Sequence, residues 1–131
     1  MKKVTCNGCF GKGLHQGHLF LIGYAYALSN NGNLIIGINS DDYIRKTKKY
    51  EPLSEQERIN EIMSLGIIKN VIVFNEQNAC EFIKQILPDV HCIGEEYKDN
   101  CPEEQLCRDL GIDIEYIPRI GNWSTRKDLK K

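Results

Sequence analysis

The chain lacks the long apolar run that a membrane-spanning helix requires. Such a helix takes about 20 consecutive apolar residues, and no stretch approaches that length. No apolar core follows the basic start Met1-Lys2-Lys3, so nothing here resembles a secretion signal. We therefore expect a cytoplasmic protein that has no membrane partner, and we expect its six cysteines to be reduced thiols.

An excess of charge of either sign is also missing. The 17 basic and 18 acidic residues give a formal net charge of -1, whereas a nucleic-acid-binding domain usually carries a basic face. We therefore expect no nucleic-acid partner. Proline is scarce, with four residues in 131, and no linker, repeat or low-complexity segment interrupts the chain. Residues 1–131 are therefore expected to form a single domain.

Short apolar runs alternate with amphipathic segments along the whole chain. The apolar runs predict strands at residues 3–9, 34–38, 71–74, 90–93 and 112–117. Helical periodicity and capping signals predict helices at residues 18–29, from 54 onward, at 78–87, at 102–110 and in a short segment from 124. Residues 39–52 are expected to form a basic loop. This order predicts an α/β fold, a Rossmann-like doubly wound sheet of about five parallel strands.

A glycine-rich turn with two histidines, residues 8–18, separates the first strand from the first helix. The helix has almost no polar face, so we expect it to be heavily covered. Glycines allow the backbone to approach an anion closely, and a helix N-terminus presents unpaired N–H groups. The imidazoles of His15 and His18 can donate further hydrogen bonds. The pattern predicts a phosphate site at the carboxyl edge of the sheet, where ligands of such folds bind.

Two cysteines, Cys6 and Cys9, form a Cys-x-x-Cys pattern at the end of the first strand. A redox pair is one reading, but the helix begins well after Cys9 and cannot lower its thiol pKa. Half of a zinc site is another, but no second Cys or His pair completes four ligands. We favour a third interpretation, two small side chains near a strand end, and we predict no metal site in the protein.

Several segments resemble the nucleotidylyltransferase superfamily. His15-Gln16-Gly17-His18 is similar to its HxGH motif. Residues 39–42, 52–58, 94–97 and 118–125 resemble its second strand exit, a helix start, the loop after the fourth strand and a closing signature. The resemblance covers essentially the whole chain. It is nearest to glycerol-3-phosphate cytidylyltransferase and to the nucleotidyltransferase domain of ADP-heptose synthase.

The resemblance implies that an acceptor phosphate attacks the α-phosphorus of a nucleoside triphosphate and that pyrophosphate leaves. Mg²⁺ would accompany the triphosphate, bound mainly by phosphate and water, and the family implies a homodimer. The implied catalytic residues are His15, His18, Lys46 and Arg119. The implied nucleotide-binding residues are Cys9, Phe10, Gly17, Arg58, Gly94, Ser124 and Thr125. The implied substrate-binding residues are Lys12, Lys48 and Trp123.

The glycine turn departs from the family pattern. Members carry an Asp after Gly-x-Phe, whereas Phe10 is followed here by Gly11-Lys12-Gly13, and the turn is one residue longer. Three functions remain open. The first is transfer of CMP from CTP to a phosphorylated small polyol or sugar such as glycerol 3-phosphate. The second is transfer of AMP from ATP to a sugar 1-phosphate. The third is a non-catalytic nucleotide-binding module.

Overall fold

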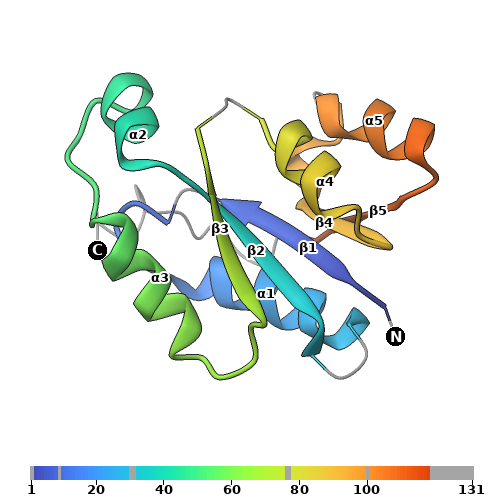
Figure 1. Cartoon of the computed structure of the whole chain (residues 1–131), viewed down its shortest axis with the longest axis horizontal. Coiled ribbons are helices and arrows are strands. Elements are labelled where there is room, and N and C mark those ends of the chain that lie inside the picture. Colours follow the sequence, from blue (N-terminus) through green and yellow to red (C-terminus); the bar gives the residue numbers. More distant parts are fainter. Residues whose placement is uncertain (1, 9, 30–31, 76–77, 100, 119–131) are drawn as a thin grey trace.

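A computed structural model describes residues 2–8, 10–29, 32–75, 78–99 and 101–118. Within these ranges five strands form one parallel sheet in the order β3-β2-β1-β4-β5 (Figure 1). The strands are β1 (Val4–Gly8), β2 (Leu34–Asn39), β3 (Asn70–Phe74), β4 (Val90–Gly94) and β5 (Asp113–Ile117). The helices are α1 (Gln16–Leu28), α2 (Asp41–Thr47), α3 (Glu55–Met63), α4 (Cys80–Ile86), α5 (Pro102–Leu110) and the short 3₁₀ helix η2 (Glu95–Tyr97). The predicted Rossmann-like sheet is confirmed.

Helices cover both faces of the sheet, and each face has its own apolar core. In Figure 1, α1 and α3 lie below the sheet, and α4 and α5 lie above its right half. The first core joins β1, β2 and β4 to Ile22 of α1 and Ile62 of α3. The second joins Ile35 of β2 to Phe82 of α4 and Cys107 of α5. Every residue of β2 is buried, as expected for a parallel strand covered on both sides.

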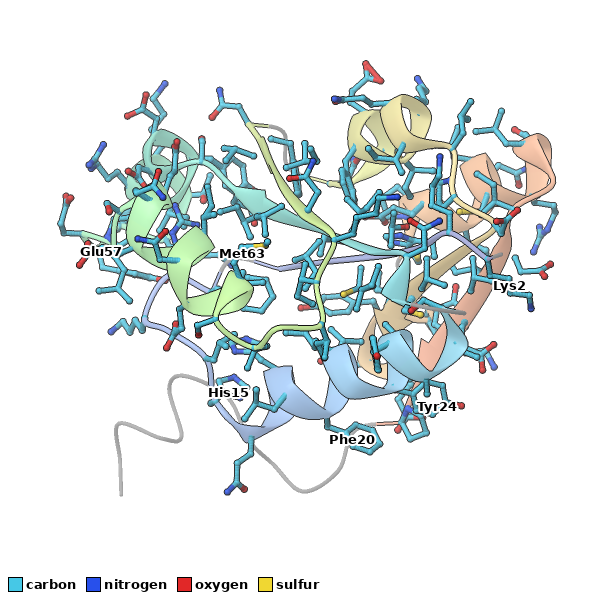
Figure 2. All side chains as sticks on the ribbon, turned by 60° about the horizontal axis from the view of Figure 1, so that its bottom comes forward. Lys2, His15, Phe20, Tyr24, Glu57 and Met63 are labelled. Atoms are coloured by element: carbon cyan, nitrogen blue, oxygen red, sulfur yellow. The ribbon has the colours of Figure 1, made fainter. Side chains whose placement is uncertain are left out.

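Helix α1 is less covered than the sequence predicts. Leu19, Phe20 and Tyr26 are 44%, 36% and 38% exposed. Among its described residues only Ile22 and Ala25 are buried, because one stripe of the helix faces the sheet. Figure 2 shows Phe20 on the outer side of α1. None of the helices in the described ranges is long and apolar enough to cross a membrane.

A second difference concerns residues 39–52, which the sequence analysis assigns to a loop. Residues 41–47 form helix α2. Ser40 caps it, since its side-chain oxygen accepts the backbone N–H of Tyr43 at 3.1 Å. Asp41 and Asp42 occupy the first turn, where negative charge is favourable, and Arg45 and Lys46 occupy the last. Local capping and charge therefore stabilise a helix that has only one buried residue, Ile44.

A buried polar pair joins β1 to β4 in the middle of the sheet. Thr5 and His91 are register partners on these strands, and the Thr5 hydroxyl lies 2.8 Å from His91 Nδ1. His91 Nε2 is buried and has no hydrogen-bond partner among the described residues. Burial lowers the pKa of His91 from its ordinary 6.5 to about 4, because desolvation penalises the charged imidazolium.

The depressed pKa of His91 predicts that acid weakens the fold. Between pH 6.5 and pH 4 the unfolded chain binds a proton at this histidine and the folded chain does not, so stability falls as the pH falls. A difference of one in pKa corresponds to about 1.4 kcal/mol, so this group alone removes about 3 kcal/mol from the free energy of unfolding over that range. Urea denaturation at several pH values measures the slope. His91→Asn should reduce this slope by the share of His91 and leave that of His18, whereas Thr5→Val, which keeps the imidazole, should retain most of it.

Candidate functional site

The strand order reverses between β1 and β4, so the switch point of the sheet lies at the carboxyl ends of these two strands. From β1 the chain moves to β2 and β3 on one side, and from β4 it moves to β5 on the other. The helices that follow the two strands pack on opposite faces, since α1 belongs to the first core and α5 to the second. Gly8 ends β1 and Gly94 ends β4. Ligands of doubly wound sheets bind at such a switch point.

A tight turn, residues 10–13, carries the chain from β1 towards α1. Phe10 has a positive φ of 55°, and its carbonyl accepts the N–H of Gly13 at 3.0 Å. The Phe10 ring is buried and meets the His18 ring edge-on, with 4.6 Å between centroids. The buried Phe10 ring thus joins the start of the turn to His18 in the first turn of α1.

His15 and His18 cap the N-terminus of α1 reciprocally. His15 Nδ1 accepts the backbone N–H groups of Gly17 at 3.0 Å and of His18 at 3.4 Å. His18 Nδ1 in turn accepts the N–H of His15 at 3.2 Å. The two rings stack with 3.7 Å between centroids. Together they form a capping box, an arrangement usually built from Ser or Thr with Glu or Gln.

This cap fixes the proton positions of both imidazoles. A nitrogen that accepts a hydrogen bond carries no proton, so a neutral ring must hold its proton on Nε2. Burial, and secondarily the neighbouring His15, lowers the pKa of His18 to about 3. His18 is therefore neutral at physiological pH, and its Nε2–H is a hydrogen-bond donor. Figure 2 shows His15 at the start of α1, on the side of the molecule that carries α3.

The turn is held against the segment that joins α2 to α3. The backbone N–H of Leu53 donates to the Gly11 carbonyl at 2.8 Å. The N–H of Leu14 donates to Glu61 Oε1 of α3 at 3.1 Å. The predicted substrate-binding Lys12 lies at the tip of the turn, with its Nζ 4.8 Å from the ring centroid of Tyr50. Sequence reasoning did not single out Tyr50 or Glu61, because nothing local marks them.

Residues 39–58, which run from the end of β2 to α3, form what we call the wall of the site. Arg58 is fully buried in this wall. Its Nε donates to the Leu53 carbonyl at 2.9 Å, and one terminal nitrogen donates to the Asn39 carbonyl at 2.6 Å. The other terminal nitrogen forms an ion pair with Asp41. One guanidinium thus ties the end of β2, the start of α2 and the segment before α3 together. Its predicted contact with the nucleotide stays a prediction, and the structure gives it a supporting place.

The starts of α2 and α3 also bind each other. Glu55 Oε2 accepts the N–H of Asp41 at 2.8 Å, and Asp41 Oδ2 accepts the N–H of Glu55 at 3.3 Å. Each helix therefore uses a carboxylate of the other as a cap. These two carboxylates join the starts of α2 and α3 within the wall of the site. The sequence pattern around Ser54 does not predict this contact between the helices.

The other predicted site residues divide into two groups. Gly17 lies in the first turn of α1, and Gly94 ends β4. Lys46 and Lys48 are exposed at the end of α2. Five predicted residues lie outside the described ranges, namely Cys9, Arg119, Trp123, Ser124 and Thr125.

The cysteine pattern at β1 does not have the environment of a reactive thiol. Cys6 is completely buried in the first core. Burial, and then the proximity of Cys92, raises the pKa of the Cys6 thiol far above its ordinary value. Because the thiolate is the nucleophilic form, Cys6 is suited to packing. Its partner in the pattern, Cys9, lies outside the described residues.

Known proteins resemble the chain along most of its length. The family model described as cytidylyltransferase-like matches residues 5–119. FAD synthase from Korarchaeum cryptofilum is 29% identical across 99% of this chain and 90% of that protein. The bifunctional protein HldE of Helicobacter pylori (strain J99) is 36% identical across 99% of this chain and 27% of that protein. The chain therefore spans about a quarter of the length of the HldE proteins that it matches.

Solved structures share the fold at lower identity. The lipopolysaccharide core biosynthesis protein from Thermoplasma volcanium has a TM-score of 0.70 and 22% identity, over 94% of this chain and 99% of that one. Pantoate-beta-alanine ligase from Francisella tularensis, solved with beta-gamma ATP and beta-alanine, has a TM-score of 0.69 and 15% identity over 98% of this chain and 65% of that one. At these identities the comparison concerns the fold alone.

The burial of Arg58 predicts that it matters more for stability than Arg45, its exposed neighbour. Arg58→Met should cost about 3 kcal/mol of unfolding free energy, because it removes the cationic partner of Asp41 and the donor to two backbone carbonyls, that of Asn39 being buried. Arg45 pairs with Asp42 and Glu51 at the surface, where ion pairs contribute little. Arg45→Met is the matched control and should have a much smaller effect. Denaturation of both variants in urea compares them, and equal losses would contradict the supporting role of Arg58.

Proposed function

The chain belongs to the cytidylyltransferase-like family of nucleotidyltransferases, and we propose that it transfers a nucleoside monophosphate from a nucleoside triphosphate to the phosphate of a small acceptor. The acceptor is a phosphorylated polyol or sugar, and pyrophosphate is the second product. The observation that carries the proposal is the reciprocal cap of His15 and His18, in which each Nδ1 accepts a backbone N–H, so that each neutral ring carries its proton on Nε2. A homodimer stays a prediction.

The chemistry needs little from the protein besides position and charge. The attacking phosphate oxygen is already an anion, so no strong base is required. Rate enhancement then comes from in-line alignment and from stabilising the charge on the transferring phosphoryl group. In this proposal the Nε2–H groups of His15 and His18 donate to triphosphate oxygens. The positive end of the α1 dipole adds to the same field.

Further predicted residues are proposed to contact the substrates. Lys46 and Lys48 are exposed at the end of α2, and we propose that they neutralise the α-phosphate and the leaving pyrophosphate. Arg119 is proposed to hold phosphate bidentately. Ser124 and Thr125 are proposed as a further set of donors, and Trp123 as a contact to the substrate.

Mg²⁺ fits this proposal as a companion of the triphosphate. Among the described residues no group of three or more His, Cys, Asp or Glu side chains is placed to hold a metal ion. Mg²⁺ commonly keeps several waters and binds through substrate phosphates, so it would not need a cluster of protein ligands. The ion would neutralise phosphate charge, while the imidazoles position the oxygens that it does not hold.

The reciprocal cap allows the helix and the chemistry to be separated by mutation. His15→Asn keeps a good N-cap acceptor, and His18→Gln keeps the side-chain acceptor of a capping box. Both variants should therefore fold with little loss of stability. Each removes an Nε2–H donor, so each should lower kcat by roughly a hundredfold or more. Pyrophosphate release under saturating substrate measures the effect.

Gln16 provides the matched control for these variants. It is exposed in the first turn of α1, between the two histidines, and Gln16→Ala should retain activity. Losses below about tenfold for both histidine variants, well short of the usual effect of such a donor, would overturn their catalytic assignment. Nucleotide binding without turnover on any acceptor would instead support a non-catalytic module.

Two nucleotides remain candidates, and we place ATP ahead of CTP. The sequence motifs alone put CTP slightly ahead. FAD contains an adenylate, however, and the FAD synthase relative matches 90% of its own length. CTP stays the second candidate because of the family description and the resemblance to glycerol-3-phosphate cytidylyltransferase.

Thermal unfolding distinguishes the two nucleotides. A ligand that binds only the folded state raises the Tm according to its concentration and affinity. At equal concentrations with Mg²⁺, ATP is expected to raise the Tm more than CTP. Tripolyphosphate serves as the control, because it reports the part of the shift that does not depend on the base. A larger shift with CTP would reverse the order of the two candidates.

A further inference from the structure

The turn that departs from the family pattern is a built feature rather than a loose insertion. A Cβ on Gly11 would lie 2.1 Å from the Tyr50 hydroxyl oxygen. Only glycine at position 11 therefore permits the tyrosine to approach the backbone of the turn this closely. The Gly11 carbonyl accepts the N–H of Leu53 at 2.8 Å. Two adjacent contacts thus hold the turn against the segment before α3.

This docking places the ammonium of Lys12 over an aromatic face. Its Nζ lies 4.8 Å from the Tyr50 ring centroid, within the range of a cation–π interaction. Such a contact restricts a flexible side chain while leaving its N–H groups able to bind an anion. Lys12 itself is exposed. Tyr50 is therefore a positioning residue, and Lys12 is the group that it positions.

Lys12 has no ion-pair partner among the described residues. In the part of the chain that the structure describes, Arg45 is neutralised by Asp42 and Glu51, and no ion pair includes Lys12, Lys46 or Lys48. An anionic group bound at Lys12 would therefore gain favourable electrostatic energy from a charge that no described carboxylate pairs with.

We propose that Lys12, held by Tyr50, binds a second anionic group of the acceptor, a carboxylate or an additional phosphate beside the phosphate that is nucleotidylated. The inference rests on the proposed function and deepens it, since it names the class of acceptor. A neutral polyol phosphate lacks the group that this lysine recognises. An acceptor that carries it should bind more tightly and should be preferred.

The position of the pair in the sheet assigns it to the acceptor rather than to the nucleotide. The nucleotide is expected at the switch point between β1 and β4. Tyr50 follows β2 and α2, and β2 lies on the opposite side of β1 from β4. Lys12 and Tyr50 therefore belong to the β2 side of the switch point. We assign the anion that this pair binds to the acceptor, because the nucleotide is expected on the side of β4.

A matched pair of probe acceptors tests the proposal. Glycerol 3-phosphate and glycerate 3-phosphate share a carbon skeleton, and only the second carries a carboxylate. The wild-type protein should show kcat/KM for glycerate 3-phosphate at least tenfold above that for glycerol 3-phosphate. Lys12→Met should bring this ratio close to one.

Tyr50→Phe keeps the ring and should keep the preference, whereas Tyr50→Leu should weaken it through KM for the acceptor. Lys69→Met, at the opposite edge of the sheet before β3, is the charge-matched control and should leave the ratio unchanged.

Calorimetric binding of the two compounds separates failure of this inference from failure of the proposed function. Turnover of both compounds without a preference overturns the anion subsite and leaves nucleotidyl transfer intact. Preferential binding of glycerate 3-phosphate that Lys12→Met abolishes supports the subsite even when neither compound is turned over. Failure to bind either compound overturns it. A Lys12→Met variant that changes only KM for the triphosphate assigns the lysine to the nucleotide and also overturns it.

Discussion

The reciprocal hydrogen bonds between His15 and His18 are the interaction on which the site depends. They satisfy three backbone N–H groups at the start of α1, and in doing so they consume the Nδ1 lone pair of each ring. The same bonds therefore set where the helix begins and which nitrogen carries the proton. Burial keeps His18 neutral, so the helix N-terminus gains a donor that does not depend on protonation. In each imidazole, Nδ1 caps the helix and Nε2 is left as the proposed donor to substrate.

The wall beside this cap depends on a different kind of interaction. Arg58 brings together the carbonyls of Asn39 and Leu53 and the carboxylate of Asp41, groups from three segments that meet only at the carboxyl edge of the sheet. Asp41 and Glu55 then cap each other's helices. Burial of a charge requires such complete pairing. The arginine therefore fixes the path of the chain from β2 to α3, and the turn that carries Lys12 docks onto this path.

Local signals in the sequence predicted the elements well and their mutual contacts poorly. Pro102 and Gly111 bracket α5 as observed, and Ser54 with Glu57 forms the capping box that the spacing predicts. Helix α2 was missed because it buries only Ile44, so capping and charge rather than periodicity support it. The burial of Arg58 depends on acceptors up to 19 residues away in sequence. The cap of α1 was missed because imidazoles stand where hydroxyl and carboxylate groups are usual.

The division between cap and turn separates the chemistry from the choice of acceptor. The two imidazoles proposed to act on the triphosphate are held by hydrogen bonds within residues 15–18. The turn that carries Lys12 is held by the cation–π contact of Lys12 with Tyr50 and by the hydrogen bond of the Gly11 carbonyl with Leu53, which are separate from the bonds of the cap. A change at the tip of the turn therefore alters the charge presented to the acceptor without disturbing the imidazole donors. Under the proposed function, a lysine in place of the usual carboxylate changes the class of acceptor and leaves the mode of transfer the same, because the nucleophile reaches the same phosphorus whatever its second group is.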